Sequence, residues 1–330
     1  MTEIDKHIKL LLDKKDLENP TSFEELGYIF LGPLLFNFFI WLKEEMSETD
    51  LVLFNSREGY FLEKIYKIFQ TKYNLPKSVY FKTSRKISSI SSFFTKDDVY
   101  DTFKLHRYSG TISNLLNDRF GITGIIDDTI VDTNNSIPDV EKYIDKILES
   151  AKKTRLEYEV YIKNIIHNSK NIMMVDSGFQ GMTQYNIQKT FGINLKGRYI
   201  TYKGNIPLKN TKGFCDFYKA NFKDNIIFFE SIFTDKIGTY INIIDGKFVN
   251  ENIEILFFDK KEKIIEGIKS FIDDMFEFDI NSNETQYEYS EYIFNLMCKK
   301  DYIKNDSLFD IFFHDNYYSR DSIKKLDRWK

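Results

Sequence analysis

Residues 172–191 read IMMVDSGFQGMTQYNIQKTF and predict a strand, a turn and a helix in immediate succession. The apolar run Ile172–Val175 is typical of a buried strand. Asp176–Gly181 offers an acid and two glycines for a turn, and Thr183–Phe191 has the apolar spacing of a helix. A further strand is predicted at Arg198–Tyr202. Two strands joined by a helix in this way are expected to be parallel.

The same order of elements occurs earlier in the chain. Leu51–Phe54 predicts a buried strand, and Asn55–Gly59 is a polar turn that directly follows it. Tyr60–Tyr73 has apolar residues at helical spacing, and Val79–Lys82 predicts the next short strand. Strands that alternate with helices are typical of α/β proteins. We therefore expect a parallel sheet flanked by helices.

The rest of the chain predicts mostly helices. A long helical pattern runs over residues 137–167, and helical spacing returns at Lys260–Phe278 and Tyr287–Lys299. No element is predicted between residues 93 and 135, where the sequence is polar and irregular. The helical pattern near the end of the chain predicts a mostly helical C-terminal extension.

This organisation suggests two parts and no membrane span. We expect an α/β domain with N-terminal helices over residues 1–210 and the helical extension over residues 211–330. The most apolar run, Tyr28–Leu42, contains Gly32 and Pro33 and is shorter than the roughly 20 residues that a spanning helix needs. It therefore predicts a buried helix. The first residues do not form a signal peptide, so a cytoplasmic location is expected, with or without attachment to the inner membrane.

Composition excludes several classes of function. The 330 residues carry a net charge of -4, which argues against a general nucleic-acid binder. The two cysteines and four histidines match no metal or redox spacing. The chain also lacks a Walker phosphate loop, a Rossmann glycine fingerprint, an HExxH helix and a nucleophile elbow. Nucleotide hydrolysis, NAD chemistry and zinc proteolysis are therefore disfavoured.

Two polar loops stand out because ligands of open α/β sheets bind at the carboxyl ends of strands. One is Asn55–Gly59. The other follows Asp176, and its backbone amides with the Thr183 hydroxyl could cradle a phosphate. A solvated turn in the first case and a tight turn with a capping acid in the second are the alternatives. The candidate ligand-binding residues of these loops and of a third strand end are Asn55, Ser56, Arg57, Gly59, Ser84, Arg85, Ser177, Gly178, Phe179, Gln180, Gly181, Met182 and Thr183.

These loops resemble those of type I phosphoribosyltransferases. A strand, an acidic turn and small residues that end in Thr183 resemble the ribose-5-phosphate loop of that family, although Ser177 stands where a second acid is usual. The polar, Gly59-containing loop that opens a helix is similar to the pyrophosphate loop of the same family. The resemblance implies a type I phosphoribosyltransferase-like sheet.

A closer resemblance covers roughly residues 26–240. The chain is similar there to the region that follows a haloacid-dehalogenase (HAD)-type phosphatase domain in large capsule and O-antigen proteins. Their first loop typically reads Arg-Asp-Gly, and here it is Arg57-Glu58-Gly59. The strings that carry the resemblance are LGYIFLGPLLFNFFIWL, FNSREGYFLEKIY, YFKTSR, VDSGFQGMTQ and ESIFTDKIGTY.

That family implies a glycosyltransferase of surface-polysaccharide synthesis. Such an enzyme moves 5-phosphoribofuranose from phosphoribosyl pyrophosphate to a glycan acceptor, free or lipid-linked, with Mg²⁺ as the expected cofactor. A phosphatase then removes the 5-phosphate. Because Asp127-Asp128-Thr129 does not supply an Asp-x-Asp nucleophile motif, this chain would need a separate HAD-type phosphatase. The extension after residue 210 is then the expected acceptor-binding region, by elimination.

The resemblance also assigns roles to individual residues. Arg57 would hold the pyrophosphate bidentately, with amides from Ser56 and Gly59, and Arg85 is a second candidate for the same group. Asp176 would face the ribose hydroxyls, directly or through Mg²⁺. Glu58 would be the general base or a Mg²⁺ ligand, and we favour the base.

Glu230 is the rival base, and its alternative interpretation is a solvated glutamate on a helix surface, which the sequence favours. Two other classes of function remain open at this point. One is a non-catalytic module that scaffolds a polysaccharide assembly complex. The other is a phosphohydrolase that acts on a phosphosugar at the same loops.

Overall fold

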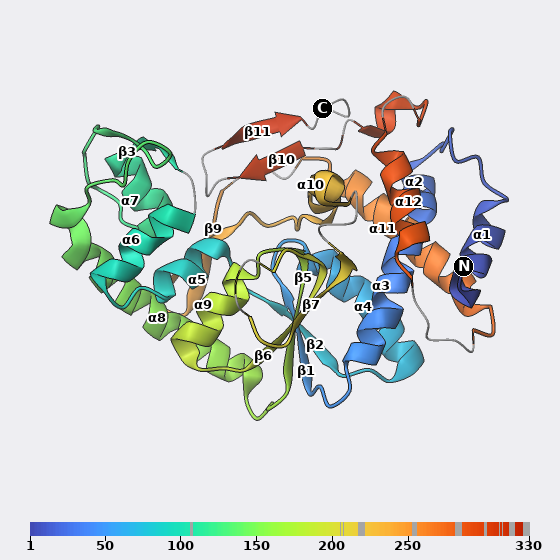
Figure 1. The fold of residues 1–330 in the computed structure, drawn as a ribbon, viewed down its shortest axis with the longest axis horizontal. Helices are drawn as coiled ribbons and strands as arrows, with labels where there is room; N and C mark the ends of the chain where they lie inside the picture. Colours follow the sequence, from blue (N-terminus) through green and yellow to red (C-terminus); the bar gives the residue numbers. More distant parts are fainter. Residues whose placement is uncertain are drawn as a thin grey trace.

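The computed structural model contains a five-stranded parallel sheet flanked by helices (Figure 1). The structure describes residues 1–105, 108–204, 206, 208–216, 222–252, 256–280, 286–299, 302–309, 311, 313–316 and 321–325. Strand order across the sheet is β2-β1-β5-β6-β7, and every neighbouring pair is parallel. The strands are β1 (Leu51–Asn55), β2 (Lys77–Phe81), β5 (Ile172–Phe179), β6 (Leu195–Tyr202) and β7 (Thr211–Asp216). The expected α/β class, with a parallel sheet flanked by helices, is thereby confirmed, and the type I phosphoribosyltransferase-like variant stays a prediction.

Helices cover both faces of the sheet because alternate strand residues point to opposite faces. Val52 and Phe54 of β1 join a core with helices α3 (Gly32–Glu45) and α4 (Gly59–Tyr73). Leu51 and Leu53 join a second core on the other face. The helices of that second face are α5 (Arg85–Ser91), α8 (Ile144–Ile166) and α9 (Met182–Phe191). All five residues of β1 are buried, as a central strand between two helical layers requires.

The apolar N-terminal segment is part of the first core. Ser22 caps this segment by accepting a hydrogen bond from the Glu25 N–H at 3.1 Å. Phe23–Glu45 is long and apolar enough to cross a membrane by length and composition, but 89% of its most apolar window is buried inside the protein. The absence of a membrane span stays a prediction. The elements here are α1 (Glu3–Leu12), α2 (Phe23–Leu26), the π-helix η1 (Gly27–Leu31) and α3.

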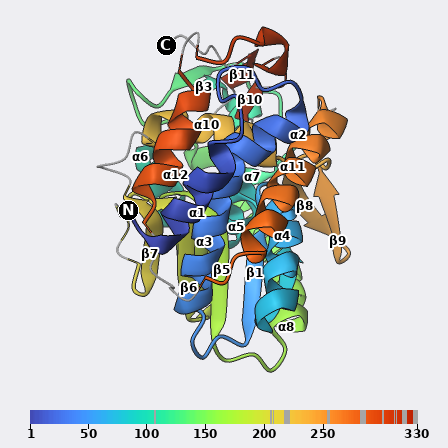
Figure 2. The ribbon, with the colours of Figure 1, turned by 90° about the vertical axis from the view of Figure 1, so that its right-hand side faces the viewer.

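The C-terminal region is mostly helical and packs against these N-terminal helices (Figure 2). Helix α11 (Phe258–Phe276) crosses α2, η1 and α3, and α12 (Glu288–Met297) contacts η1 and α3. The first core therefore includes residues from both sides of residue 210, and the two-domain division stays a prediction. The other elements are α10 (Phe222–Phe233), β8 (Tyr240–Ile244), β9 (Lys247–Asn250), η3 (Asp306–Phe309), β10 (Phe313–Asn316) and β11 (Asp321–Lys325).

The stretch from residue 93 to 135, for which the sequence predicted no element, forms most of a small cap with its own core. In Figure 1 the cap lies at one end of the molecule. Its elements are α6 (Lys96–Leu105), β3 (Ser109–Thr111), α7 (Ile112–Phe120), β4 (Ile130–Asp132) and η2 (Glu141–Tyr143). Of these, η2 lies within residues 137–167, where the sequence predicted one long helix, and α8 itself begins only at Ile144. The core of the cap includes Phe103, Leu116, Phe120 and Ile147. The missed elements are short, so each carries too few apolar repeats to reveal its period.

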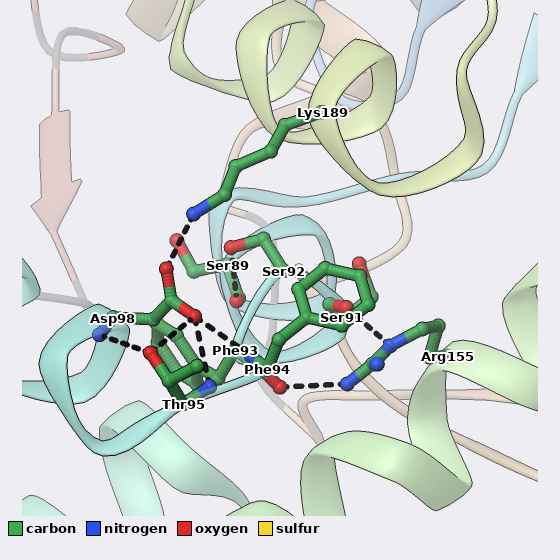
Figure 3. A network of polar contacts seen from close by, with 9 residues as sticks. All are labelled: Ser89, Ser91, Ser92, Phe93, Phe94, Thr95, Asp98, Arg155 and Lys189. Atoms are coloured by element: carbon green, nitrogen blue, oxygen red, sulfur yellow. Dashed lines mark hydrogen bonds and ion pairs between the residues drawn. The ribbon is translucent and has the colours of Figure 1, made fainter.

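Arg155 of α8 and Lys189 of α9 bind the chain at the start of this cap (Figure 3). Arg155 of α8 donates to the carbonyls of Ser91 and Phe93 at 2.9 and 2.6 Å. Lys189 of α9 pairs with Asp98 of α6 at 2.5 Å. Because the Arg155 bonds go to backbone atoms, they fix the path of the chain as it enters the cap.

The contact of α11 with α2 and η1 generates a stability prediction. A Cβ on Gly267 would overlap the carbonyl of Glu24, and a Cβ on Gly27 would overlap that of Ile264. Gly267→Ala should therefore destabilise the protein by about 1–3 kcal/mol through overpacking, although alanine favours a helix by about 1 kcal/mol. Urea unfolding measures the change. Ser270→Ala, on the exposed side of α11, is the control, and equal stability of the two variants would contradict the prediction.

Candidate active site

The candidate site lies at the point in the sheet where the order in which the chain adds strands reverses. The chain passes from β1 to β2 on one side, and from β5 to β6 and β7 on the other. A crevice is expected outside the carboxyl ends of β1 and β5, the two strands at this switch point. Phe54 pairs with Val175, so the next residues, Asn55 and Asp176, are neighbours across the two strands. The two loops that the sequence singled out for ligand binding therefore begin side by side.

Asn55 and Asp176 form the centre of the site. Asn55 Nδ2 donates to Asp176 Oδ2 at 2.7 Å, and the N–H of Ser177 donates to the other carboxylate oxygen at 2.8 Å. Asn55 is 3% exposed, and its Oδ1 is buried without a hydrogen-bond partner among the described residues. An unsatisfied buried acceptor costs about 1–3 kcal/mol. Such an atom beside a carboxyl group is expected where a ligand completes the site.

Three carboxyl groups from distant parts of the chain gather here. Burial and, after it, the negative charge of Glu58 raise the pKa of Asp176 to about 7. Burial and, after it, the charge of Glu58 also raise the pKa of Glu230 to about 8. Glu230 lies on α10, above the sheet in Figure 1, and is half-buried in this cluster instead of pointing into open solvent.

Two guanidinium groups oppose this negative charge. The charges of Arg57 and Arg85 lower the pKa of Glu230, and Arg85 also lowers that of Asp176. Arg57 lies 4.0 Å from Glu58, measured from Nε to Oε1. The structure thus brings together all three candidate catalytic acids and both candidate arginines. Clusters in which burial and like charges move the pKa of acids toward neutrality are typical of functional sites.

The loop after β1 is held in a strained conformation. Arg57 has a φ of +75°, which non-glycine residues seldom adopt. Gly59 begins α4, and a Cβ there would lie 2.7 Å from the backbone carbon of Phe54, so glycine is required by the close approach. Strain of this kind persists only where the surroundings enforce it.

Tyr80 and Asp235 hold the loop in this strained conformation. The N–H of Arg57 donates to the hydroxyl of Tyr80 at 3.1 Å, and this hydroxyl donates to Asp235 Oδ2 at 2.5 Å. Asp235 is 1% exposed, and burial together with Asp235 raises the pKa of Tyr80. Sequence reasoning missed this brace, although both residues lie in the strings YFKTSR and ESIFTDKIGTY that carry the resemblance.

Several candidate ligand-binding groups already make hydrogen bonds within the protein. The N–H of Ser56 donates to the carbonyl of Phe81 at 3.0 Å, so the predicted amide contact to pyrophosphate is not open. The Ser56 hydroxyl is engaged by the backbone of Thr83. Ser84 caps α5 by accepting from the N–H of Ile87 at 3.0 Å. Ser56 and Ser84 thus position the loops, and Arg85 is left at the start of α5 beside the carboxyl cluster.

The second loop differs from the predicted turn over Asp176–Gly181. Strand β5 continues to Phe179 and pairs with β6, so only Gln180 and Gly181 form the turn. Successive strand residues point to opposite faces, and the buried Ser177 therefore points away from Asp176. The predicted cradle of amides from Gly178 to Thr183 is interrupted in its first half, because those residues belong to the strand.

Gly181 keeps a special backbone role. It has a φ of +72° and precedes α9, whose first two residues are Met182 and Thr183. A Cβ on Gly181 would meet the side chain of Leu208 at 2.6 Å. The amides of the first turn of α9 are the part of the predicted phosphate cradle that remains in a helix-initiating geometry.

No model of a known protein family matches this chain, and no curated protein sequence matches it. The family resemblance drawn from its motifs therefore stays a prediction. Among the described residues, no group of three or more Cys, His, Asp or Glu side chains is arranged to hold a metal ion. Pairs of carboxylates, such as Glu58 and Asp176, are the remaining sites where a cation could bind with help from a ligand.

The brace gives a prediction about Tyr80. Tyr80→Phe keeps the ring but leaves the Arg57 N–H and the Asp235 carboxylate without this hydroxyl, which should cost about 1–3 kcal/mol of stability. Asp235→Asn should show a loss of similar size. Urea unfolding of the two single variants and the double variant measures their coupling. Tyr60→Phe, in the neighbouring ring, is the control, and fully additive losses would show that the two side chains act separately.

The raised pKa values of the carboxyl cluster give a pH prediction. Glu230 holds its proton up to about pH 8 when folded, whereas an unfolded glutamate loses it near pH 4.3. Between these values the folded state binds more protons, so this contribution to stability is lost as the pH rises. The stability of Glu230→Gln relative to wild type should therefore rise as the pH increases from about 5 to about 8.5. Denaturant titrations at both pH values test this, with exposed Glu266→Gln as control, and a pH-independent difference would refute it.

Proposed function

We propose that this protein is a glycosyltransferase that moves 5-phosphoribose from phosphoribosyl pyrophosphate to a glycan hydroxyl in surface-polysaccharide synthesis. The observation that carries the proposal is the convergence of Glu58, Asp176 and Glu230 with two arginines at the switch point of a parallel sheet. A type I phosphoribosyltransferase-like variant of that sheet, and a separate phosphatase that removes the 5-phosphate, belong to the same proposal.

The chemistry of this transfer needs both signs of charge. Breaking the bond between ribose C1 and the pyrophosphate oxygen leaves positive charge on the sugar and negative charge on the leaving group. Arg57 and Arg85 would stabilise the departing pyrophosphate. Asp176, with Asn55 beside it, would face the ribose and stabilise its positive charge. A site with cations alone or acids alone would serve only half of this reaction.

The acceptor hydroxyl must also lose a proton, and Glu230 is suited to take it. A general base works best when its pKa is near the working pH. The pKa of Glu230 is raised to about 8 by burial and by the charge of Glu58, which favours it over the base role that the sequence favoured for Glu58. Glu58 would then supply the charge that tunes Glu230 and Asp176.

Magnesium fits this arrangement. The ion commonly uses one or two protein carboxylates together with phosphates and several waters. Asp176 and Glu58 would hold it, since the repulsion that raises the pKa of Asp176 would be relieved by a cation, and the buried Asn55 Oδ1 adds an oxygen acceptor nearby. When bound, Mg²⁺ would neutralise pyrophosphate charge.

The first test measures donor binding by calorimetry with phosphoribosyl pyrophosphate and Mg²⁺. Binding without turnover in the absence of acceptor supports the transferase. Slow phosphate release to water would instead indicate a phosphohydrolase, and no binding would indicate a scaffold module. Turnover is then followed by mass spectrometry, as addition of a pentose phosphate to oligosaccharides from bacterial surface polysaccharides.

Two amide substitutions separate the roles of the acids. Glu230→Gln should lower kcat by about 10²–10⁴-fold and leave donor affinity within a few-fold, because a base contributes little to ground-state binding. Glu58→Gln should weaken donor binding, with partial recovery at higher Mg²⁺. Glu266→Gln, exposed on α11 and paired with Lys269, is the matched control. Near-wild-type turnover in Glu230→Gln would return the base role to Glu58.

A further inference from the structure

Lys261 is a buried cation that sequence reasoning did not single out. It lies at the end of the first turn of α11 and is 5% exposed. The rings of Tyr60 and Phe61, at the start of α4, pack on Phe258 of α11 with centroids 6.1 and 5.6 Å apart. This packing brings the first turn of α11 beside the loop that carries Arg57. A residue of the C-terminal region thereby reaches the edge of the candidate site.

Among the described residues, the Lys261 ammonium has no counter-charge. No hydrogen bond or ion pair joins its Nζ to another residue in the part of the chain that the structure describes. Its charged neighbour is the guanidinium of Arg57, and burial together with this like charge lowers the pKa of Lys261 to about 8. Burying a charge without a partner is costly. Arg57 pairs with Glu58, whereas Lys261 is enclosed with a like charge near it. An enclosed cation in this position is expected where an anion binds.

The usual alternative is a lysine whose stem is buried and whose ammonium reaches water. Lys64 of α4 is an example close by, because its side chain is 36% exposed and its Nζ lies 3.7 Å from Glu262. Lys261 differs on both counts, since it is almost fully enclosed and no acidic residue in the described part of the chain pairs with it. Its burial therefore needs another reason.

We propose that Lys261 and Arg57 form an anion subsite that binds a phosphate or diphosphate group next to the carboxyl cluster. The identity of the anion rests on the proposed function. Two sources carry this chemistry, namely the pyrophosphate of the donor and a diphosphate that links the acceptor glycan to a lipid. The subsite makes the C-terminal region part of ligand binding, whichever source supplies the anion.

The test compares wild type with Lys261→Met, which keeps the length and the apolar stem of the side chain. Calorimetry with inorganic pyrophosphate, without metal, should show at least about tenfold weaker binding in the variant. Lys64→Met removes a nearby charge that is already paired, and should change binding less than twofold. The ligand-free stability of Lys261→Met should equal or exceed that of wild type, because an enclosed, unpartnered charge is removed.

Two further titrations identify the source and separate this proposal from the transferase. Weaker binding of phosphoribosyl pyrophosphate to Lys261→Met assigns the subsite to the donor. A loss confined to a short-chain prenyl diphosphate sugar assigns it to the acceptor. Unchanged affinity for all three ligands in a folded Lys261→Met would overturn the subsite and leave the transferase standing. Loss of pyrophosphate binding, with no donor binding or turnover in wild type, would retain the subsite and reject the transferase.

Discussion

The parallel pairing of β1 with β5 is the constraint on which the candidate site depends. These strands lie some 120 residues apart in the sequence, yet their register places Asn55 beside Asp176 and fixes the bond between them. Helices then pack on both faces, so the carboxyl ends of the strands are where polar groups such as Asn55 and Asp176 gather. Tyr80 contributes to the site because β2 pairs with β1, and Glu230 and Asp235 contribute because α10 packs against α4, the helix that follows β1.

The site concentrates charge that the fold does not fully balance. Glu58 raises the pKa of two neighbouring acids, while Arg57 lowers that of Lys261. Each like-charge contact makes the ligand-free protein less stable than an apolar version of the same region would be. Proteins accept such costs at sites where a charged ligand restores the balance. The strained Arg57 backbone, held by a buried Tyr80 hydroxyl, fits the same interpretation.

Sequence patterns predicted the existence of individual helices and strands better than the boundaries of these elements or the contacts between them. The buried runs at Leu51–Phe54 and Ile172–Val175 are confirmed as strands, because unbroken apolar segments of that length suit a central sheet. Strand β5 extends further, since pairing with β6 overrides the turn preference of Gly178. The Tyr80–Asp235 brace and Lys261 could not be predicted, because each depends on contacts between segments far apart in sequence, which no local period records.

The contact between α11 and the N-terminal helices has a consequence for how the chain is made. The apolar segment Phe23–Glu45 leaves the ribosome more than 200 residues before α11, which covers it in the finished protein. At ordinary rates of translation that interval lasts about 10–40 s. During it, an apolar surface that α11 covers in the finished protein is exposed, so the newborn chain is open to aggregation for longer than the buried position of this segment suggests.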